Sequence, residues 1–112
     1  MEVSFASRKL QKVCESEKAL RRAYGNDGAK KVMSRVSDLR AVATLEDMRN
    51  LPGRCHELAG DRAGQLAIEL ARGRRLVIAP TNGWPSGKAG GAHVWGKIDA
   101  VQVLEIADYH DG

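Results

Sequence analysis

The apolar residues of this chain change their spacing about halfway along, and this change most constrains the fold. From residue 29 to residue 43 they recur with the period of a helix, at Val32, Met33, Val36 and Leu39. From residue 65 onward they alternate with polar residues, which is the period of a half-buried strand. Helices followed by a run of strands predict an α+β fold in which the helices pack on a mainly antiparallel sheet.

Two helices are expected in the first half of the chain, after a short strand at Glu2–Ala6. Ser7 is a suitable N-cap for the first helix, and Ser16 is placed to restart or kink it. The run from Gly25 to Gly28 predicts a turn. The second helix then extends from about Ala29 to Ala43 and lies antiparallel to the first.

Strand signals divide the second half into four segments, which are 54–58, 65–70, 74–79 and 98–107. Glycine-containing turns at 60–64 and 72–73 suit hairpins between consecutive segments, so the sheet is expected to be largely an antiparallel meander.

Alternation within two of these segments predicts which residues share a face of the sheet. In the second segment, one face carries Leu66, Ile68 and Leu70, and the other carries Gln65, Ala67 and Glu69. In the last segment, one face carries Ala100, Gln102, Leu104 and Ile106, and the other carries Val101, Val103 and Glu105.

The charge balance of the chain is basic. Eighteen Lys and Arg side chains stand against fourteen Asp and Glu, which gives a formal net charge of +4, and arginine outnumbers lysine. Because the planar guanidinium binds phosphate in a bidentate manner, this bias favours a nucleic-acid partner. Charge by itself also fits an ordinary solvated surface, so specific residues have to carry the argument.

At 112 residues the chain is expected to form a single domain, 1–112. No apolar run approaches the ~20 residues of a membrane-spanning helix, which predicts a soluble, cytoplasmic protein. Cys14 and Cys55 are expected to be buried free thiols in a reducing compartment. Two cysteines, and three histidines that lack ligand spacing, predict neither a metal site nor a cofactor.

The segment Thr81–Gly96 differs in composition from the rest, with five glycines, a proline and both tryptophans. A loop of this length is either mobile or functional. Aromatic and cationic side chains of the segment are suited to contact RNA, namely Trp84, Lys88, His93 and Trp95. The favoured interpretation is simpler, with the two tryptophans anchoring the loop to the body of the protein.

An ionisable triplet, Asp108-Tyr109-His110, follows directly after the last strand segment. A second histidine, His56, lies on an earlier strand between two arginines, Arg54 and Arg62. RNA cleavage needs a base for the 2′-hydroxyl, an acid for the departing 5′-oxygen and cations for the phosphate. Two histidines and several arginines can supply this set without a metal.

The order of several short motifs resembles the RelE/ParE superfamily of toxin–antitoxin toxins, and in particular its HigB-like branch. The motifs are Cys55-His56-Glu57-Leu58, Gly60-Asp61-Arg62 with Gly64, the alternating strand at 65–70, Arg75-Leu76-Val77-Ile78 and Ile106-Ala107-Asp108-Tyr109-His110. Each is weak by itself. Their order and spacing cover nearly the whole chain.

The resemblance implies two N-terminal helices packed on a curved antiparallel sheet. It also implies a type II toxin, an mRNA interferase that cleaves mRNA on the ribosome, with a HigA-like antitoxin, the ribosome and mRNA as partners. The catalytic positions carried over are His56, Arg75, Asp108, Tyr109 and His110. The RNA-binding positions are Arg54, Arg62, Arg72 and Arg74.

The roles expected from the resemblance follow the needs of the reaction. His56 and His110 would be base and acid, in either order, and Arg75 would stabilise the phosphate. Asp108 would orient a histidine or balance its charge, and Tyr109 would position or stack a nucleobase.

Two departures from the family pattern are visible, namely Ala59, where many relatives carry a lysine, and the long glycine-rich segment. Two other functions remain open. A non-catalytic ParE-like toxin would bind a protein such as DNA gyrase, and a regulatory module would bind nucleic acid without cleaving it. The presence of His56 together with the terminal triplet favours cleavage.

Overall fold

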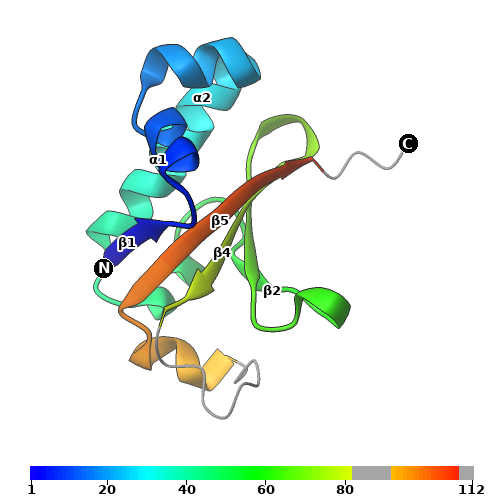
Figure 1. Cartoon of the computed structure of the whole chain (residues 1–112). Coiled ribbons are helices and arrows are strands. Elements are labelled where there is room, and N and C mark those ends of the chain that lie inside the picture. The colour runs from blue at the N-terminus through cyan, green and yellow to red at the C-terminus, as the bar shows by residue number, and fades with distance from the viewer. Residues whose placement is uncertain (82–91, 109–112) are drawn as a thin grey trace.

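The computed structural model describes residues 1–81 and 92–108, without the side chains of residues 92 and 93. Its strands and α-helices are β1 (Glu2–Phe5), α1 (Arg8–Cys14), α2 (Glu17–Ala41), β2 (His56–Glu57), β3 (Leu66–Glu69), β4 (Arg74–Pro80) and β5 (Ala100–Asp108). Short 3-10 segments are η1 (Leu45–Asn50), η2 (Gly60–Arg62), η3 (Ala71–Gly73) and η5 (Ala92–Lys97). Both α-helices lie on one side of the strands (Figure 1).

The five strands form one sheet in the order β1-β5-β4-β3-β2. Strands β2 to β5 form the expected antiparallel meander, whereas β1 pairs in parallel with β5 at the opposite edge, with Glu2 opposite Ala100. The α+β class with helices on a mainly antiparallel sheet is therefore confirmed. Within the described residues, no helix combines the length and the apolar character needed to span a membrane.

Serine side chains begin both helices, as predicted. The Ser7 hydroxyl accepts a hydrogen bond from the amide of Leu10 at 3.0 Å, and the Ser16 hydroxyl accepts one from the amide of Ala19 at 3.1 Å. Each bond satisfies an amide that has no partner within the first turn of its helix. Ser16 therefore starts a new helix instead of continuing α1.

The turn predicted from Gly25 to Gly28 is wrong in extent. Gly25 has a φ of 76° and a ψ of 177°, and this one non-helical residue changes the direction of α2, while the next three residues are already helical. These dihedrals are readily adopted only by glycine. The helix expected from Ala29 therefore begins about three residues earlier, and α2 ends at Ala41.

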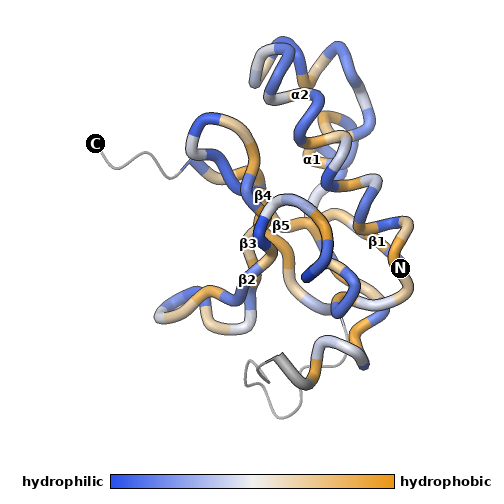
Figure 2. Tube along the Cα trace, turned by 180° about the vertical axis from the view of Figure 1, so that it is seen from behind, coloured by the Kyte–Doolittle hydropathy of each residue, from blue (hydrophilic) through white to orange (hydrophobic). Residues whose placement is uncertain are grey.

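The core lies between α2 and the facing side of the sheet. Its largest fully buried side chains include Leu20, Leu39, Leu45, Met48, Leu66, Ile68, Leu76, Ile78 and Ile98. Figure 2 shows hydrophobic segments gathered where the strands meet, and hydrophilic residues on the upper turns of α2. The opposite side of the sheet carries no α-helix.

The alternation predicted for the last strand fails at Leu104. The pairing with β4 shifts there, so that Val77 lies opposite Glu105 but Ile78 lies opposite Val103. The extra residue of this bulge reverses the faces beyond it. Val101, Val103 and Ile106 consequently all contribute to the core, whereas Ile106 was expected on the other face.

Alternation in β3 is also weaker than predicted, because Leu66, Ala67 and Ile68 are all fully buried. Ala67 belongs to the face away from the helices, where it lies in register between His56 and Val77. These larger neighbours cover its small side chain.

Candidate active site

Strand register brings predicted catalytic residues to the sheet face away from the helices, called the open face below. Directly paired residues of antiparallel strands project to the same side. His56, Ala67, Val77 and Glu105 are paired in this way across β2 to β5. The neighbouring row of the same face contains Glu69, Arg75 and Ala107. His56 and Arg75 therefore lie on one face in adjacent rows.

Glu69 is the residue that sequence reasoning missed as part of a site. Its carboxylate accepts a hydrogen bond from Nε of Arg54 at 2.5 Å. This bond is the main cause of a lowered pKa for Glu69, and the charges of Arg54, Arg75 and His56 lower that pKa further. The signal was present in the sequence, because alternation placed Glu69 on this face and a short hairpin connects it to Arg75.

The ring of His56 is oriented by the backbone. Its Nδ1 lies 2.8 Å from the carbonyl oxygen of Arg54. Since a carbonyl can only accept, Nδ1 carries the proton in this hydrogen bond, and Nε2 of the neutral ring keeps its lone pair. The imidazole is thus held in the tautomer that a general base requires at Nε2.

A strained turn before β2 makes these two contacts possible. Arg54 has a φ of 48°, in the left-handed region, and follows Gly53 with a φ of 108°. The carbonyl of Gly53 accepts a hydrogen bond from the amide of Glu69 at 2.6 Å, which joins the turn to β3. Arg54 can then direct its carbonyl to His56 and its guanidinium to Glu69, and non-glycine strain of this kind is often found at functional sites.

Arg62 is paired across the open face. Its guanidinium donates to Glu105 at 2.6 Å and to Gln65 at 2.7 Å. A salt bridge of this turn was considered from the sequence with Asp61 or Glu57, and the observed partner is Glu105 on β5. Its predicted contact with RNA stays a prediction.

Arg72 and Arg74 lie at the β3–β4 turn. The Arg74 guanidinium lies over the ring of Tyr24, 5.2 Å from its centroid, and so toward α2. Arg74 is paired with Asp108, whereas Arg75 is paired with Ala107. Asp108 therefore projects to the helix side of the sheet, away from the face of His56.

Several predicted residues fall outside the described part of the chain. Tyr109 and His110 do so, as do Trp84, Lys88 and the side chain of His93. The expected role of Asp108 in orienting a histidine thus concerns His110, which follows it in sequence, more naturally than His56.

Trp95 anchors η5 to the body of the protein. The side chain is buried, its Nε1 donates a hydrogen bond to Glu57 at 2.9 Å, and the Arg49 guanidinium lies 3.9 Å from the ring centroid. For Trp95 the anchoring interpretation is supported over stacking on RNA.

The thiols are remote from this chemistry. Both cysteines are free, Cys14 being buried as expected and Cys55 partly exposed. Burial raises the pKa of Cys14 to about 11 and that of Cys55 to about 12. Among the residues that the structure describes, no group of three or more His, Cys, Asp or Glu side chains is placed to hold a metal ion.

The fold and the open face together define a class of protein, a small α+β domain that exposes an imidazole, a carboxylate and two guanidiniums on the uncovered side of its sheet. The solved structure of a YoeB/ParE toxin from Agrobacterium tumefaciens has the same fold, with a TM-score of 0.55 and 12% sequence identity over 98% of this chain and 100% of that chain. No family model and no curated protein matches the sequence. The expected RelE/ParE-like fold is therefore confirmed by structure.

Proposed function

We propose that this protein is the toxin of a type II toxin–antitoxin system and acts as a HigB-like mRNA endonuclease on the ribosome. The likeness in fold to a YoeB/ParE toxin supports the class. The observation that carries the activity is the placement of His56 and Arg75 on one open face, with Glu69 beside both. A HigA-like antitoxin, the ribosome and mRNA are the proposed partners.

In the proposed reaction, the 2′-oxygen of a ribose attacks the adjacent phosphorus and the bond to the 5′-oxygen breaks. His56 takes the 2′-hydroxyl proton at Nε2, because Nδ1 is occupied by the Arg54 carbonyl. Arg75 stabilises the charge that develops on the phosphate oxygens. His110 returns a proton to the departing 5′-oxygen, and the products are a 2′,3′-cyclic phosphate and a 5′-hydroxyl.

Glu69 has a supporting role in this proposal. It remains ionised at neutral pH, because its lowered pKa reflects the hydrogen bond from Arg54 and the nearby cations. A fixed carboxylate between Arg54 and Arg75 holds both guanidiniums near the reacting phosphate and limits their rotation. Asp108 and Tyr109 remain proposed site residues, with the roles implied by the family.

A second candidate function has one observation in its favour. Two arginines of the open face already have carboxylate partners, Arg54 with Glu69 and Arg62 with Glu105. Such pairing reduces the positive charge available to RNA, and fits a non-catalytic ParE-like toxin that binds a protein target such as DNA gyrase.

Controlled expression of the chain, with and without the neighbouring reading frame, separates the two candidates. Growth arrest with mRNA cuts on translating ribosomes, mapped by primer extension, is expected for the wild type and should be lost in His56→Gln and His110→Ala. Lys31→Gln, on the exposed surface of α2, is the control and should remain toxic. Growth arrest with intact mRNA and altered DNA supercoiling would instead establish the ParE-like function.

A further inference from the structure

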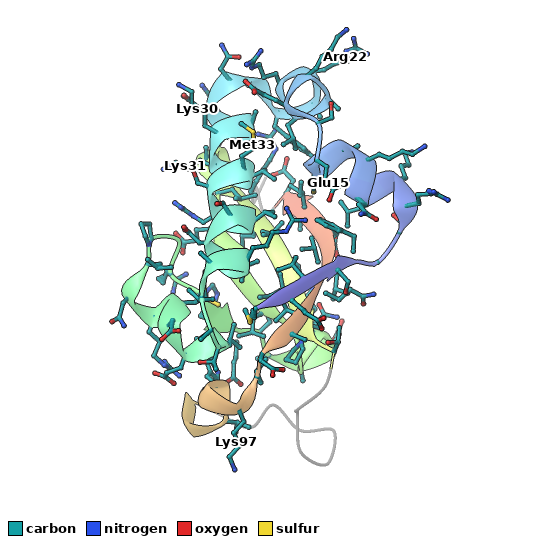
Figure 3. All side chains as sticks on the ribbon, turned by 90° about the vertical axis from the view of Figure 1, so that its left-hand side faces the viewer. Glu15, Arg22, Lys30, Lys31, Met33 and Lys97 are labelled. Carbon is teal, nitrogen blue, oxygen red and sulfur yellow. The ribbon has the colours of Figure 1, made fainter. Side chains whose placement is uncertain are left out.

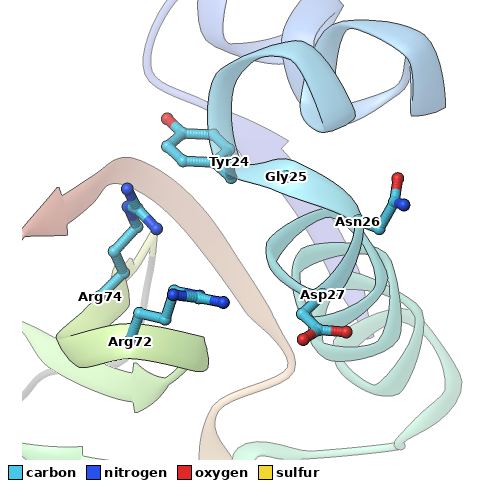
Figure 4. A pocket seen from close by; sticks show the side chains of 6 residues that line it. All are labelled: Tyr24, Gly25, Asn26, Asp27, Arg72 and Arg74. Carbon is cyan, nitrogen blue, oxygen red and sulfur yellow. The ribbon is translucent and has the colours of Figure 1, made fainter.

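A cavity of about 480 Å³ lies between the bend of α2 and the β3–β4 turn. Its lining residues are Tyr24, Gly25, Asn26, Asp27, Arg72 and Arg74 (Figure 4). The volume is within the range of sites that hold small ligands. The bend at Gly25 creates the cavity, because it turns the second part of α2 away from Tyr24.

The positive wall of the cavity consists of two arginines without carboxylate partners. Arg54 and Arg62 each form a salt bridge, but neither Arg72 nor Arg74 forms one within the described residues. Arg72 has a left-handed backbone, with a φ of 60°, and Gly73 follows with a φ of 75°. Figure 4 shows the Arg72 side chain directed toward α2 and the Arg74 guanidinium beneath the Tyr24 ring.

The other walls supply an aromatic ring and an acceptor. Tyr24 is partly buried, and burial raises its pKa, so the phenol stays neutral. Asp27 faces the arginines from the first turn after the bend, whereas Asn26 points away from them (Figure 4). Asp27 repels a further carboxylate and accepts hydrogen bonds from hydroxyl or amino groups. This combination selects a nucleotide over an acidic peptide, because a nucleotide offers a phosphate, a planar base and ribose hydroxyls together.

A second hollow, of about 220 Å³, connects this cavity to the open face. It is lined by Glu69, Leu70, Gly73, Arg74 and Arg75. It shares Arg74 with the larger cavity, and Glu69 and Arg75 with the proposed active site. A single strand that leaves the active site can therefore follow the end of the β3–β4 hairpin toward Tyr24.

We propose that the cavity between Gly25 and the β3–β4 turn is a subsite for a nucleotide of the RNA that flanks the cleaved bond. The base packs against the Tyr24 ring and the Arg74 guanidinium, the phosphate binds Arg72 and Arg74, and Asp27 accepts a hydrogen bond from the ribose or the base. The inference rests on the proposed function, since it takes RNA as the substrate.

The first test uses a fluorescein-labelled hexanucleotide with 2′-O-methyl riboses, which cannot be cleaved, and measures its affinity by fluorescence anisotropy. The double variant Arg72→Gln/Arg74→Gln should lose at least about tenfold in affinity, and its salt dependence should fall by about 1.4, at ~0.7 per lost contact with a single strand. Lys30→Gln/Lys31→Gln removes the same charge from the exposed side of α2 (Figure 3) and should change neither value appreciably. Equal losses in both double variants would overturn the subsite.

The second test concerns the aromatic wall. Tyr24→Leu should weaken binding of the same probe at least about fivefold, as expected for a lost base-stacking partner, while Tyr24→Phe should bind like the wild type. Circular dichroism melting identifies any loss due to misfolding. No binding by the wild type, or displacement of the probe by a hexaglutamate peptide as readily as by unlabelled RNA, would overturn the proposal.

The two proposals fail in different ways. If the wild type cuts mRNA on ribosomes while the cavity variants bind the probe normally, the subsite is wrong and the endonuclease stands. If the wild type binds the probe through the cavity but cuts no mRNA, the endonuclease is wrong and the RNA subsite stands.

Discussion

The indole nitrogen of Trp95 donates a hydrogen bond to the carboxylate of Glu57, 2.9 Å away, and so ties η5 to the strand that carries His56. Trp95→Phe keeps an aromatic ring beneath Arg49 but leaves the Glu57 carboxylate without this donor. We expect the free energy of unfolding to fall by about 1 kcal/mol, measured by urea denaturation. Arg49→Gln, which removes the cation and keeps the hydrogen bond, is the matched control for the ring contact. Unchanged stability of Trp95→Phe would contradict a structural role for this bond.

The activity of the proposed enzyme should depend on the shape of Arg75 as well as on its charge. Arg75→Lys keeps the positive charge but loses the planar fork that binds two phosphate oxygens. We expect the rate of mRNA cleavage on ribosomes to fall at least about tenfold, with normal thermal stability. Arg8→Lys, at an exposed position of α1, should cleave at the wild-type rate. A fully active Arg75→Lys variant would exclude bidentate phosphate binding at this position.

Acid should weaken the fold in a way that depends on Glu69. The pKa of this carboxyl is lowered in the folded protein from its ordinary value of 4.5. Its contribution to stability is therefore present above pH 4.5 and is lost as the pH falls through the lower, folded value. Glu69→Gln should be less stable than the wild type at neutral pH, and the difference should disappear in acid. The contribution is small because Glu69 is largely exposed. Urea titrations at a series of pH values check this, and a difference that grows as the pH falls would have the wrong sign.

Two glycines with positive φ should respond differently to alanine. At Gly25 a Cβ would meet no atom within 4 Å, so Gly25→Ala should cost about 1–3 kcal/mol through backbone strain. At Gly53 a Cβ would lie 2.5 Å from Cγ2 of Ile68 and 2.8 Å from Nε of Arg35. Gly53→Ala should therefore be the more destabilising of the two in urea denaturation. The reverse order would show that the turn before β2 can move away from β3.

Neither thiol should react rapidly in the folded protein. With pKa values of about 11 for Cys14 and about 12 for Cys55, at most about one thiol in a thousand is ionised at pH 8. Alkylation by iodoacetamide, followed by mass spectrometry, should be slow in buffer and fast in urea at the same pH. Fast alkylation of Cys55 in buffer would show that its surroundings open in solution.

Helix starts and hairpins of this protein were predictable because the residues that specify them are neighbours in sequence. Ser7 and Ser16 cap helices through amides three positions away, and Gly73 directly follows the turn residue Arg72. His56 and Arg75 could likewise be placed on strands, from alternation and from the family resemblance. Local patterns could not give the length of a turn, and the bend at Gly25 needed one residue instead of four.

By itself, the sequence determined the α+β class, the positions of most elements and the choice of His56 and Arg75, since each depends on local chemistry or on short-range periodicity. The tertiary structure decided which of these residues meet. Pairing of β1 with β5 joins residues almost a hundred positions apart, and the bulge near Leu104 reverses which residues face the core. The same long-range register placed Glu69 between Arg54 and Arg75 and directed Asp108 to the other face. Such contacts depend on how whole strands align in three dimensions, and no local pattern encodes that alignment.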